Sequence, residues 1–178
     1  MPGIGRNVIL ITGPPGCGKT TLILRLLPLL PGVVGGFFTR EIREARIRKG
    51  FEIVTLDGQT GLLAHVDFRS KVRVGKYGVD LVSLERLAVP AIREAAAQEK
   101  IVIIDEIGPM EIASPTFRQA VQEVLAGKTP VLATVVQRST LFTDQIKALP
   151  EIRLLTMTPE NREGLVKQVE RMILESSP

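Results

Sequence analysis

Positions 13 to 21 read GPPGCGKTT, which places glycines, a lysine and a threonine at the spacing typical of a phosphate-binding loop. The glycines let successive backbone amides point inward, and the start of the following helix adds partial positive charge. Lys19 is spaced to reach the β and γ phosphates of a nucleotide, and the Thr20 hydroxyl to hold Mg²⁺. The residues expected at the nucleotide are therefore Gly13, Pro14, Pro15, Gly16, Cys17, Gly18, Lys19, Thr20 and Thr21.

A second polar set follows the apolar run IVII at 101 to 104. Asp105 and Glu106 come at the carboxyl end of this expected strand, the edge at which open α/β sheets bind ligands. We expect Asp105 to be the second partner of Mg²⁺, and Glu106 to align or deprotonate a water molecule that attacks the γ-phosphate. A glutamate at this point favours hydrolysis over transfer to an acceptor. The alternative is an acidic pair that merely faces solvent.

Phosphate hydrolysis also gains on the order of 10³ to 10⁵ in rate from a nearby arginine. Arg138 ends the run TPVLATVVQR and is the first candidate for this catalytic role. It would lie beside Asp105 if its strand lies between the first strand and the Asp105 strand. Arg40 is the second candidate, and either could instead be an exposed arginine.

The elements that must position these residues alternate between strand and helix patterns. The run RNVILIT at 6 to 12 is continuous and β-branched, as in a strand buried on both faces. We then expect a helix over 19–27, short β runs over 37–74, and helical periodicity over 80–98 in which Pro90 opens a helix. The remaining expected elements are strand 101–105, helix 115–126, strand 130–136, helix 143–149, strand 152–156 and helix 159–174.

This alternation predicts an α/β fold, a parallel sheet flanked by helices with an antiparallel β excursion at about 37–74. Ser114 and Thr158 each precede a proline, which predicts capped helix starts after them. The chain has 178 residues, 44% of them apolar, which indicates one domain spanning 1–178.

The composition of the chain says more about its cellular location than about its function. A lone Cys17 forms no internal disulfide, and the first residues lack the pattern of a secretory signal, so we expect a cytoplasmic protein. The most apolar stretch, 22–34, is interrupted by Arg25, Pro28 and Pro31, which argues against a membrane span. The net charge of +4 favours an anionic partner without choosing between nucleotides and nucleic acids. We expect a monomer.

Basic residues gather in the β excursion. Arg69, Lys71 and Arg73 have the two-residue spacing of one strand face, and Arg40, Arg43, Arg46, Arg48 and Lys49 precede them. They form either a basic lip for phosphate or RNA or an ordinary solvated face. Aromatic residues do not alternate with them as a nucleic-acid stacking platform requires, so the solvated face is favoured. Tyr77 and His65 are each more typical of packing than of binding.

Five stretches together resemble a small P-loop family of nucleoside-triphosphatases, known from thermophilic microbes and from animals as the cancer-related NTPases. These stretches are GPPGCGKTT, GGFFTREIRE, VGKYGVDLVSLER, IIDEIGPMEI and TPENREGLV. The resemblance implies a RecA-like core, a requirement for Mg²⁺, and slow hydrolysis of ATP, GTP and other nucleoside triphosphates with little base preference. Some members were also assigned nucleotide-kinase-like activity.

The resemblance also implies a second stretch of the nucleotide site. Its residues are Ile104, Asp105, Glu106, Ile107, Gly108, Pro109, Met110 and Glu111. At the position of Pro109 the family has a lysine, so that contact to phosphate is not expected here. The sequence therefore predicts a Mg²⁺-dependent nucleoside triphosphatase. A nucleotide or nucleoside kinase and an RNA-associated NTPase are the alternatives.

Overall fold

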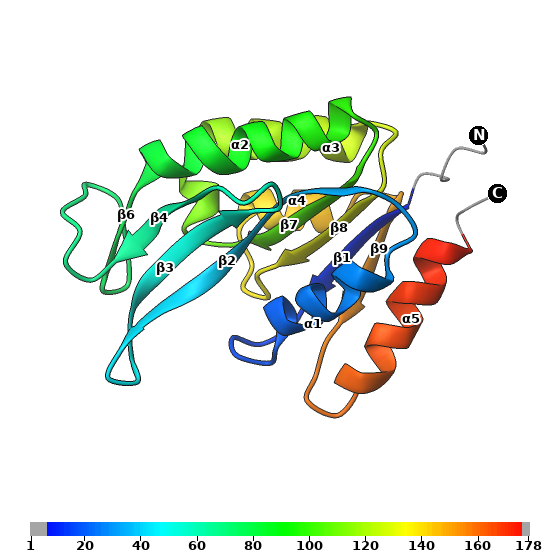
Figure 1. Ribbon diagram of the computed structural model, residues 1–178, viewed down its shortest axis with the longest axis horizontal. Coiled ribbons are helices and arrows are strands. Elements are labelled where there is room, and N and C mark those ends of the chain that lie inside the picture. The colour runs from blue at the N-terminus through cyan, green and yellow to red at the C-terminus, as the bar shows by residue number, and fades with distance from the viewer. Residues whose placement is uncertain (1–6, 176–178) are drawn as a thin grey trace.

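One sheet of nine strands runs through residues 7–175, the part of the chain that the computed structural model describes (Figure 1). The strands are β1 (Val8–Thr12), β2 (Val34–Glu44), β3 (Ile47–Thr55), β4 (Thr60–His65), β5 (Arg73–Val74), β6 (Tyr77–Val79), β7 (Ile101–Ile107), β8 (Val131–Val135) and β9 (Ile152–Thr156). The helices are α1 (Lys19–Leu26), α2 (Leu81–Ala97), α3 (Pro115–Ala126), α4 (Leu141–Lys147) and α5 (Arg162–Leu174), with short 3-10 turns η1 (Leu27–Leu29) and η2 (Glu111–Ala113).

The strand order is β5-β6-β4-β3-β2-β7-β8-β1-β9. Strands β2, β7, β8, β1 and β9 run parallel, and the pairs from β2 to β5 are antiparallel. Strand β8 lies between β1 and β7, which is the placement that the argument for Arg138 required. The chain segments that follow β1, β7 and β8 therefore leave the sheet at one edge, because parallel strands share their carboxyl ends.

Strand β2 belongs to both halves of the sheet. Its first residues, Val34 to Phe37, pair with β7 in parallel, and its later residues pair with β3 in the opposite direction. The expected antiparallel excursion is confirmed, and it extends beyond its expected end to β6. It is a continuation of the main sheet because β2 passes from one half into the other.

Helix α2 is continuous over Leu81–Ala97, so the expectation that Pro90 opens a helix is wrong. A proline inside a helix removes one backbone hydrogen bond and costs about 3 kcal/mol. Leu84, Ala88 and Ile92 lie on both sides of the proline and are wholly buried. Burying one large apolar side chain contributes about 1.5 to 3 kcal/mol, so the buried stripe outweighs the proline.

Capping side chains set the starts of α3 and α4, whereas α5 begins after a turn. Ser114 Oγ accepts from the Phe117 amide at 3.0 Å, which confirms the predicted start of α3. Thr140 Oγ1 accepts from the Thr143 amide at 3.1 Å and begins α4 two residues before the expected position. Thr158 Oγ1 accepts from the Asn161 amide at 3.3 Å, as a cap would, but the residues that it closes form a turn and α5 begins only at Arg162, so the predicted helix start is corrected. Asn161 Oδ1 accepts from the Thr158 amide at 2.8 Å and holds a turn ahead of α5.

Two apolar layers cover the two faces of the parallel sheet. Helices α1 and α5 cover one face, and α2, α3 and α4 the other (Figure 1). Strand β1 contributes to both layers, with Val8 and Leu10 on one side and Ile9 and Ile11 on the other. Among the described residues no helix is both long and apolar enough to cross a bilayer. The layers leave the carboxyl edge of the sheet as the place where loops with polar side chains meet.

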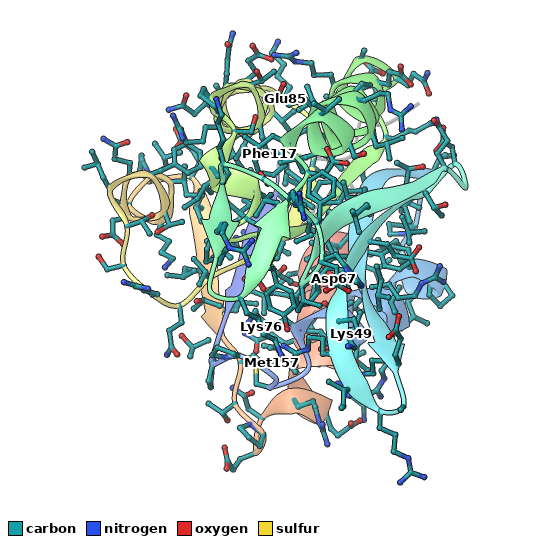
Figure 2. All side chains as sticks on the ribbon, turned by 90° about the vertical axis from the view of Figure 1, so that its left-hand side faces the viewer. Lys49, Asp67, Lys76, Glu85, Phe117 and Met157 are labelled. Atoms are coloured by element: carbon teal, nitrogen blue, oxygen red, sulfur yellow. The ribbon has the colours of Figure 1, made fainter. Side chains whose placement is uncertain are left out.

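The layer under α2 and α3 is centred on two aromatic rings. Phe37 of β2 and Phe117 of α3 are wholly buried, and their ring centroids lie 6.0 Å apart in an edge-to-face arrangement. Figure 2 shows Phe117 between the sheet and the helices above it. This contact ties the strand that leads into the excursion to the helix that follows β7.

We expect Phe117→Ala to lower the free energy of unfolding by about 3 to 5 kcal/mol, because it removes a buried ring and leaves a cavity. Val82→Ala is the control, since the Val82 side chain on α2 is 76% exposed, and it should change stability by no more than about 0.5 kcal/mol. Urea unfolding measures both. Equal effects of the two substitutions would contradict the placement of Phe117 in the core.

Candidate active site

The loop between β1 and α1 adopts the conformation that its glycines predict. Gly18 is the residue before α1 and has φ of +102°, in the left-handed region that side chains disfavour. The Cys17 amide donates to the Pro14 carbonyl at 3.2 Å and closes the turn. Pro14, Pro15 and Gly16 are exposed, whereas Cys17 is buried. The loop therefore presents its backbone to solvent at the edge of the sheet.

Lys19 joins this loop to strand β7. Its side chain is only 8% exposed, and Nζ donates to the Gly13 carbonyl at 3.1 Å. The same atom lies 3.6 Å from Glu106 Oε2. The lysine and the glutamate that the sequence analysis singled out are therefore neighbours, although 87 positions separate them. Thr20 is half-buried and Thr21 is exposed at the start of α1.

Asp105 is wholly buried at the end of the parallel part of β7. Its Oδ1 accepts from the Thr134 hydroxyl of β8 at 2.5 Å. Burial raises the pKa of the Asp105 carboxyl, and the Thr134 hydroxyl, the Thr20 hydroxyl and the Thr39 amide act to lower it. Oδ2 has no hydrogen-bond partner among the described residues. A buried carboxylate oxygen that lacks a donor is suited to bind a cation.

Two further carboxyl groups adjoin Asp105. Glu106 is 27% exposed; burial raises its pKa, Lys19 lowers it, and Asp105 raises it again. Glu111, in η2, is 5% exposed, and burial together with the nearby Glu106 raises its pKa to about 8. The cluster therefore combines three acidic groups with one ammonium.

The rest of the expected stretch from 104 to 111 contributes little side-chain chemistry. Ile104 and Ile107 point into the layer under α2 and α3 and are wholly buried. Gly108 is buried, Met110 is half-buried, and Pro109 is exposed. Among the side chains of this stretch, only the three carboxyl groups gather at the edge near Lys19.

The two arginine candidates differ in their surroundings. Arg138 follows β8 as an exposed residue, and no described side chain forms an ion pair with it. Arg40 of β2 is paired with Glu52 of β3, with Nε 2.7 Å from Oε1. It follows Thr39, whose amide is close to Asp105. The structure thus leaves both arginines near the edge of the sheet and neither in contact with Lys19 or Glu106.

Carboxylates pair with four of the eight basic residues singled out in the excursion, and among the described residues Arg69, Lys71 and Arg73 form no ion pair. Four of its five basic residues from 40 to 49 are ion-paired: Arg40 with Glu52, Arg43 and Arg48 with Glu41, and Lys49 with Glu44. Tyr77 packs edge-to-face on Phe51 with ring centroids 5.4 Å apart. Figure 2 shows Lys49 and Lys76 on the side of the molecule that carries this excursion. These contacts support the interpretation as a solvated face.

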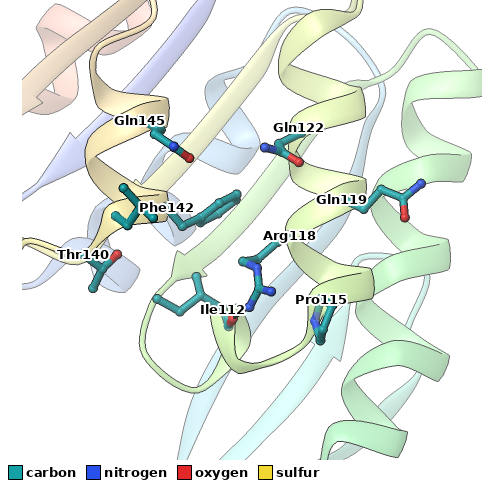
Figure 3. Close-up of a pocket in the computed structure, with 9 residues that line it drawn as sticks. Ile112, Pro115, Arg118, Gln119, Gln122, Thr140, Phe142 and Gln145 are labelled. Carbon is teal, nitrogen blue, oxygen red and sulfur yellow. Dashed lines mark hydrogen bonds between the residues drawn. The ribbon is translucent and has the colours of Figure 1, made fainter.

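A cavity of about 540 Å³ lies away from the phosphate-binding loop, between α3 and α4 (Figure 3). Its lining residues are Ile112, Pro115, Arg118, Gln119, Gln122, Thr140, Leu141, Phe142 and Gln145. Neither the loop from 13 to 21 nor the carboxyl cluster contributes to this lining. Arg118 Nη1 donates to the Ile112 carbonyl at 2.6 Å on one wall, so this residue supports η2 from outside the site.

Sequence reasoning missed Thr134 and Thr39 as neighbours of Asp105. Thr134 is the one polar residue of β8, VLATV, and it faces the same side of the sheet as Asp105. A polar residue inside an apolar run was a usable signal once β8 was placed beside β7. Thr39 acts through its amide, so its side chain gave no signal.

Comparison with known proteins places this geometry in context. Residues 8–170 match the protein family described as NTPase. The chain is 44% identical to nucleoside-triphosphatase THEP1 of Thermotoga petrophila over 161 residues, which cover 90% of this chain and 89% of that protein. It is 37% identical over 177 residues to the cancer-related nucleoside-triphosphatase homolog of Bos taurus, covering 90% of this chain and 93% of that protein.

Two solved structures have a similar fold. The crystal structure of THEP1 from the hyperthermophile Aquifex aeolicus superposes with a TM-score of 0.81 at 37% identity and covers 90% of this chain and 95% of that chain. The solution structure of a human cancer-related nucleoside triphosphatase superposes with a TM-score of 0.82 at 36% identity and covers 97% of this chain and 100% of that chain. The RecA-like arrangement of the core is thus shared.

The raised pKa of Glu111 makes stability depend on pH. The carboxyl is neutral in the folded protein up to about pH 8 but ionises near 4.5 in the unfolded chain. The unfolded state binds fewer protons between these values, so this group's contribution to the free energy of unfolding falls as the pH rises. Glu111→Gln should remove this contribution and gain stability relative to the wild type from about pH 5 to about pH 8.

Urea unfolding at several pH values measures this difference. Glu94→Gln, at an exposed position on α2, serves as the control and should follow the wild type. A difference between Glu111→Gln and wild type that is the same at every pH would contradict a neutral, buried Glu111.

Proposed function

The chain belongs to this family of nucleoside-triphosphatases, and from that premise we propose that it hydrolyses nucleoside triphosphates to diphosphates and phosphate with Mg²⁺ as the metal. ATP, GTP and other nucleoside triphosphates are substrates with little base preference, because the chemistry described above recognises the triphosphate. The enzyme is a monomer in this proposal. It is also cytoplasmic, which agrees with the free, buried Cys17, because thiols stay reduced in the cytosol.

The observation that carries the proposal is the contact between Lys19 and Glu106 across the edge of the sheet. Nζ of Lys19 lies between the Gly13 carbonyl and Glu106 Oε2. A phosphate-binding lysine and a carboxylate that acts on water must both lie near the same γ-phosphate. Their proximity supports hydrolysis at the end of the phosphate-binding loop.

Asp105 and Thr20 fit a magnesium ion. Asp105 has a buried oxygen without a donor, and the Thr20 hydroxyl lies beside the same carboxylate. Among the described residues, no group of three His, Cys, Asp or Glu side chains is arranged as a metal cage. Mg²⁺ typically binds through one or two protein oxygens, water and phosphates, so a sparse set of ligands suits it. The ion would neutralise charge that develops on the phosphates.

The chain's own residues divide the reaction among them. Lys19 and the backbone amides of the loop hold the phosphates in line with the attacking water. Glu106 accepts a proton from that water as its oxygen bonds to the γ-phosphorus, and the bond from the γ-phosphorus to the bridging oxygen breaks. The raised pKa of Glu106 brings it closer to the working pH of a general base.

In this proposal turnover is slow because neither Arg138 nor Arg40 contacts Lys19 or Glu106. An arginine at the transferred phosphate contributes on the order of 10³ to 10⁵ in rate. We retain Arg138 as the proposed catalytic arginine, because it is exposed and follows the strand next to β7. Arg40 would first have to leave Glu52. In either case the arginine must move before it contributes.

We expect Lys19→Ala to weaken ATP binding by at least about tenfold, because it removes the only side-chain cation of the loop from the phosphates. Lys128→Ala is the matched control, since Lys128 is exposed in the segment before β8, at the opposite edge of the sheet. Titration of each variant with a fluorescent ATP analogue measures Kd. Full ATP binding by Lys19→Ala would show that the loop assignment is wrong.

Glu106→Gln should keep nucleotide binding and lower kcat by about 10² to 10⁴, because the amide holds the same shape but accepts no proton. Glu94→Gln controls for loss of an acidic residue. Phosphate release under saturating nucleotide gives kcat, and Kd is measured on the same preparations. Hydrolysis by Glu106→Gln at the wild-type rate would remove Glu106 from this role.

Product analysis separates hydrolysis from transfer. Protein with Mg²⁺ and γ-labelled ATP or GTP is incubated with and without a mixture of nucleosides and nucleoside monophosphates. Label should appear only as free phosphate, at similar rates for both nucleotides. Label on an acceptor would make the protein a kinase, and a rate that rises with added RNA and falls steeply with salt would favour the RNA-associated alternative.

A further inference from the structure

Glu111 is a buried acid without a role in the mechanism above. It lies in the short turn η2 and is 5% exposed. Fully buried glutamates are rare unless they are paired or neutralised. The groups near it are the carboxylates of Glu106 and Asp105 and the backbone amides of Gly108 and of Glu111 itself. A carboxyl group buried beside two other carboxyl groups is unfavourable, so packing alone does not explain why Glu111 lies there.

The turn that carries Glu111 is braced on several sides. The Ile112 amide donates to the Gly108 carbonyl at 3.0 Å, and the Ser114 amide donates to the Glu111 carbonyl at 3.1 Å. Arg118 of α3 donates to the Ile112 carbonyl (Figure 3). The Ser114 hydroxyl, which caps α3, also donates to Glu85 of α2 at 2.6 Å. The backbone of Glu111 is thus fixed to two helices.

Gly108 brings the two glutamates together. A methyl group on its Cα would lie 2.9 Å from Glu106 Oε1, closer than such contacts occur, and 3.0 Å from Glu111 Oε2, which is an unusually tight contact. The two side chains therefore pack against the same bare Cα. The other Glu106 oxygen, Oε2, is the one near Lys19. Glu106 is held from one side by Lys19 and from the other by Gly108 and Glu111.

We propose that Glu111 is a positioning residue for hydrolysis, whose buried carboxyl, packed with Glu106 against Gly108, holds the Glu106 carboxylate in the orientation that aligns the attacking water. This inference rests on the proposed role of Glu106. Glu111 touches neither water nor phosphate in this scheme. Because its pKa is raised to about 8, its carboxyl is mainly neutral at pH 7 and packs beside the Glu106 carboxylate without a second full charge.

Glu111→Ala should lower kcat on the order of 10²-fold, the cost of a misplaced reacting group, while KM and the Kd for nucleotide change by no more than about twofold. Glu111→Gln should restore most of the lost rate at pH 7, since the amide has the shape and neutrality of the protonated acid. Glu123→Ala is the control, because Glu123 is an acid on the outer surface of α3 that pairs with Arg93.

Gly108→Ala tests the same contact without removing either acid. The added methyl group should displace Glu106 and lower kcat in the same way as Glu111→Ala. Gly164→Ala is its control, because a methyl group there meets nothing within 4 Å. This second variant keeps the proposal open to test if Glu111→Ala does not fold, which thermal unfolding and nucleotide binding monitor.

The double variant Glu106→Gln/Glu111→Ala separates positioning from a general structural effect. If Glu111 acts through Glu106, the double variant should hydrolyse no more slowly than Glu106→Gln alone. A further multiplicative loss, a loss confined to KM, or a wild-type kcat for Glu111→Ala would each overturn the positioning role and leave the proposed function standing. A wild-type rate for Glu106→Gln would instead overturn the role of Glu106 and this inference with it.

Discussion

The site depends on burying three carboxyl groups beside one ammonium. Asp105, Glu106 and Glu111 are largely or wholly removed from water, and Lys19 is the cation among them. Burying a charge is costly unless a partner compensates it. The structure meets this cost in part by raising the pKa of all three acids, with Glu111 raised to about 8. Magnesium at Asp105 would compensate part of the negative charge that remains.

The sheet is what brings these groups together. Strand β8 separates β1 from β7, so the loop that carries Lys19 and the strand end that carries Asp105 lie two strands apart at one edge. Thr134 of the intervening strand spans the gap by donating to Asp105. On the far side of β7, β2 brings the Thr39 amide to the same carboxylate. Asp105 is thus held from both neighbouring strands.

Local features were predictable from the sequence, and features that depend on tertiary packing were not. The loop GPPGCGKTT and the pair after IVII were found because their chemistry lies in consecutive residues. The proximity of Lys19 to Glu106 depends on the strand order, which the structure shows. The alternation of strands and helices predicts a parallel sheet but does not by itself fix the order of its strands. Pro90 was misplaced because a continuous buried stripe, visible only after folding, outweighs its helix-breaking tendency. The sequence placed Glu111 in the expected nucleotide-site stretch but did not single it out. Its burial depends on Gly108 and on the helices behind η2, which only the folded structure shows.

The burial of three acids also determines where the stability of the fold must come from. A cluster of buried acids weakens the edge of the sheet, so the elements that hold it must be stabilised elsewhere. The apolar layers on the two faces of the sheet supply this. One layer includes Cys17 of the phosphate-binding loop and Leu22 of α1, and the other includes Ile104 and Ile107 of β7. Ile104 and Ile107 show the arrangement most directly. They flank Asp105 and Glu106 in sequence, and their side chains lie in the apolar layer under α2 and α3. Their burial fixes the strand, while the acids between them stay at the carboxyl edge of the sheet.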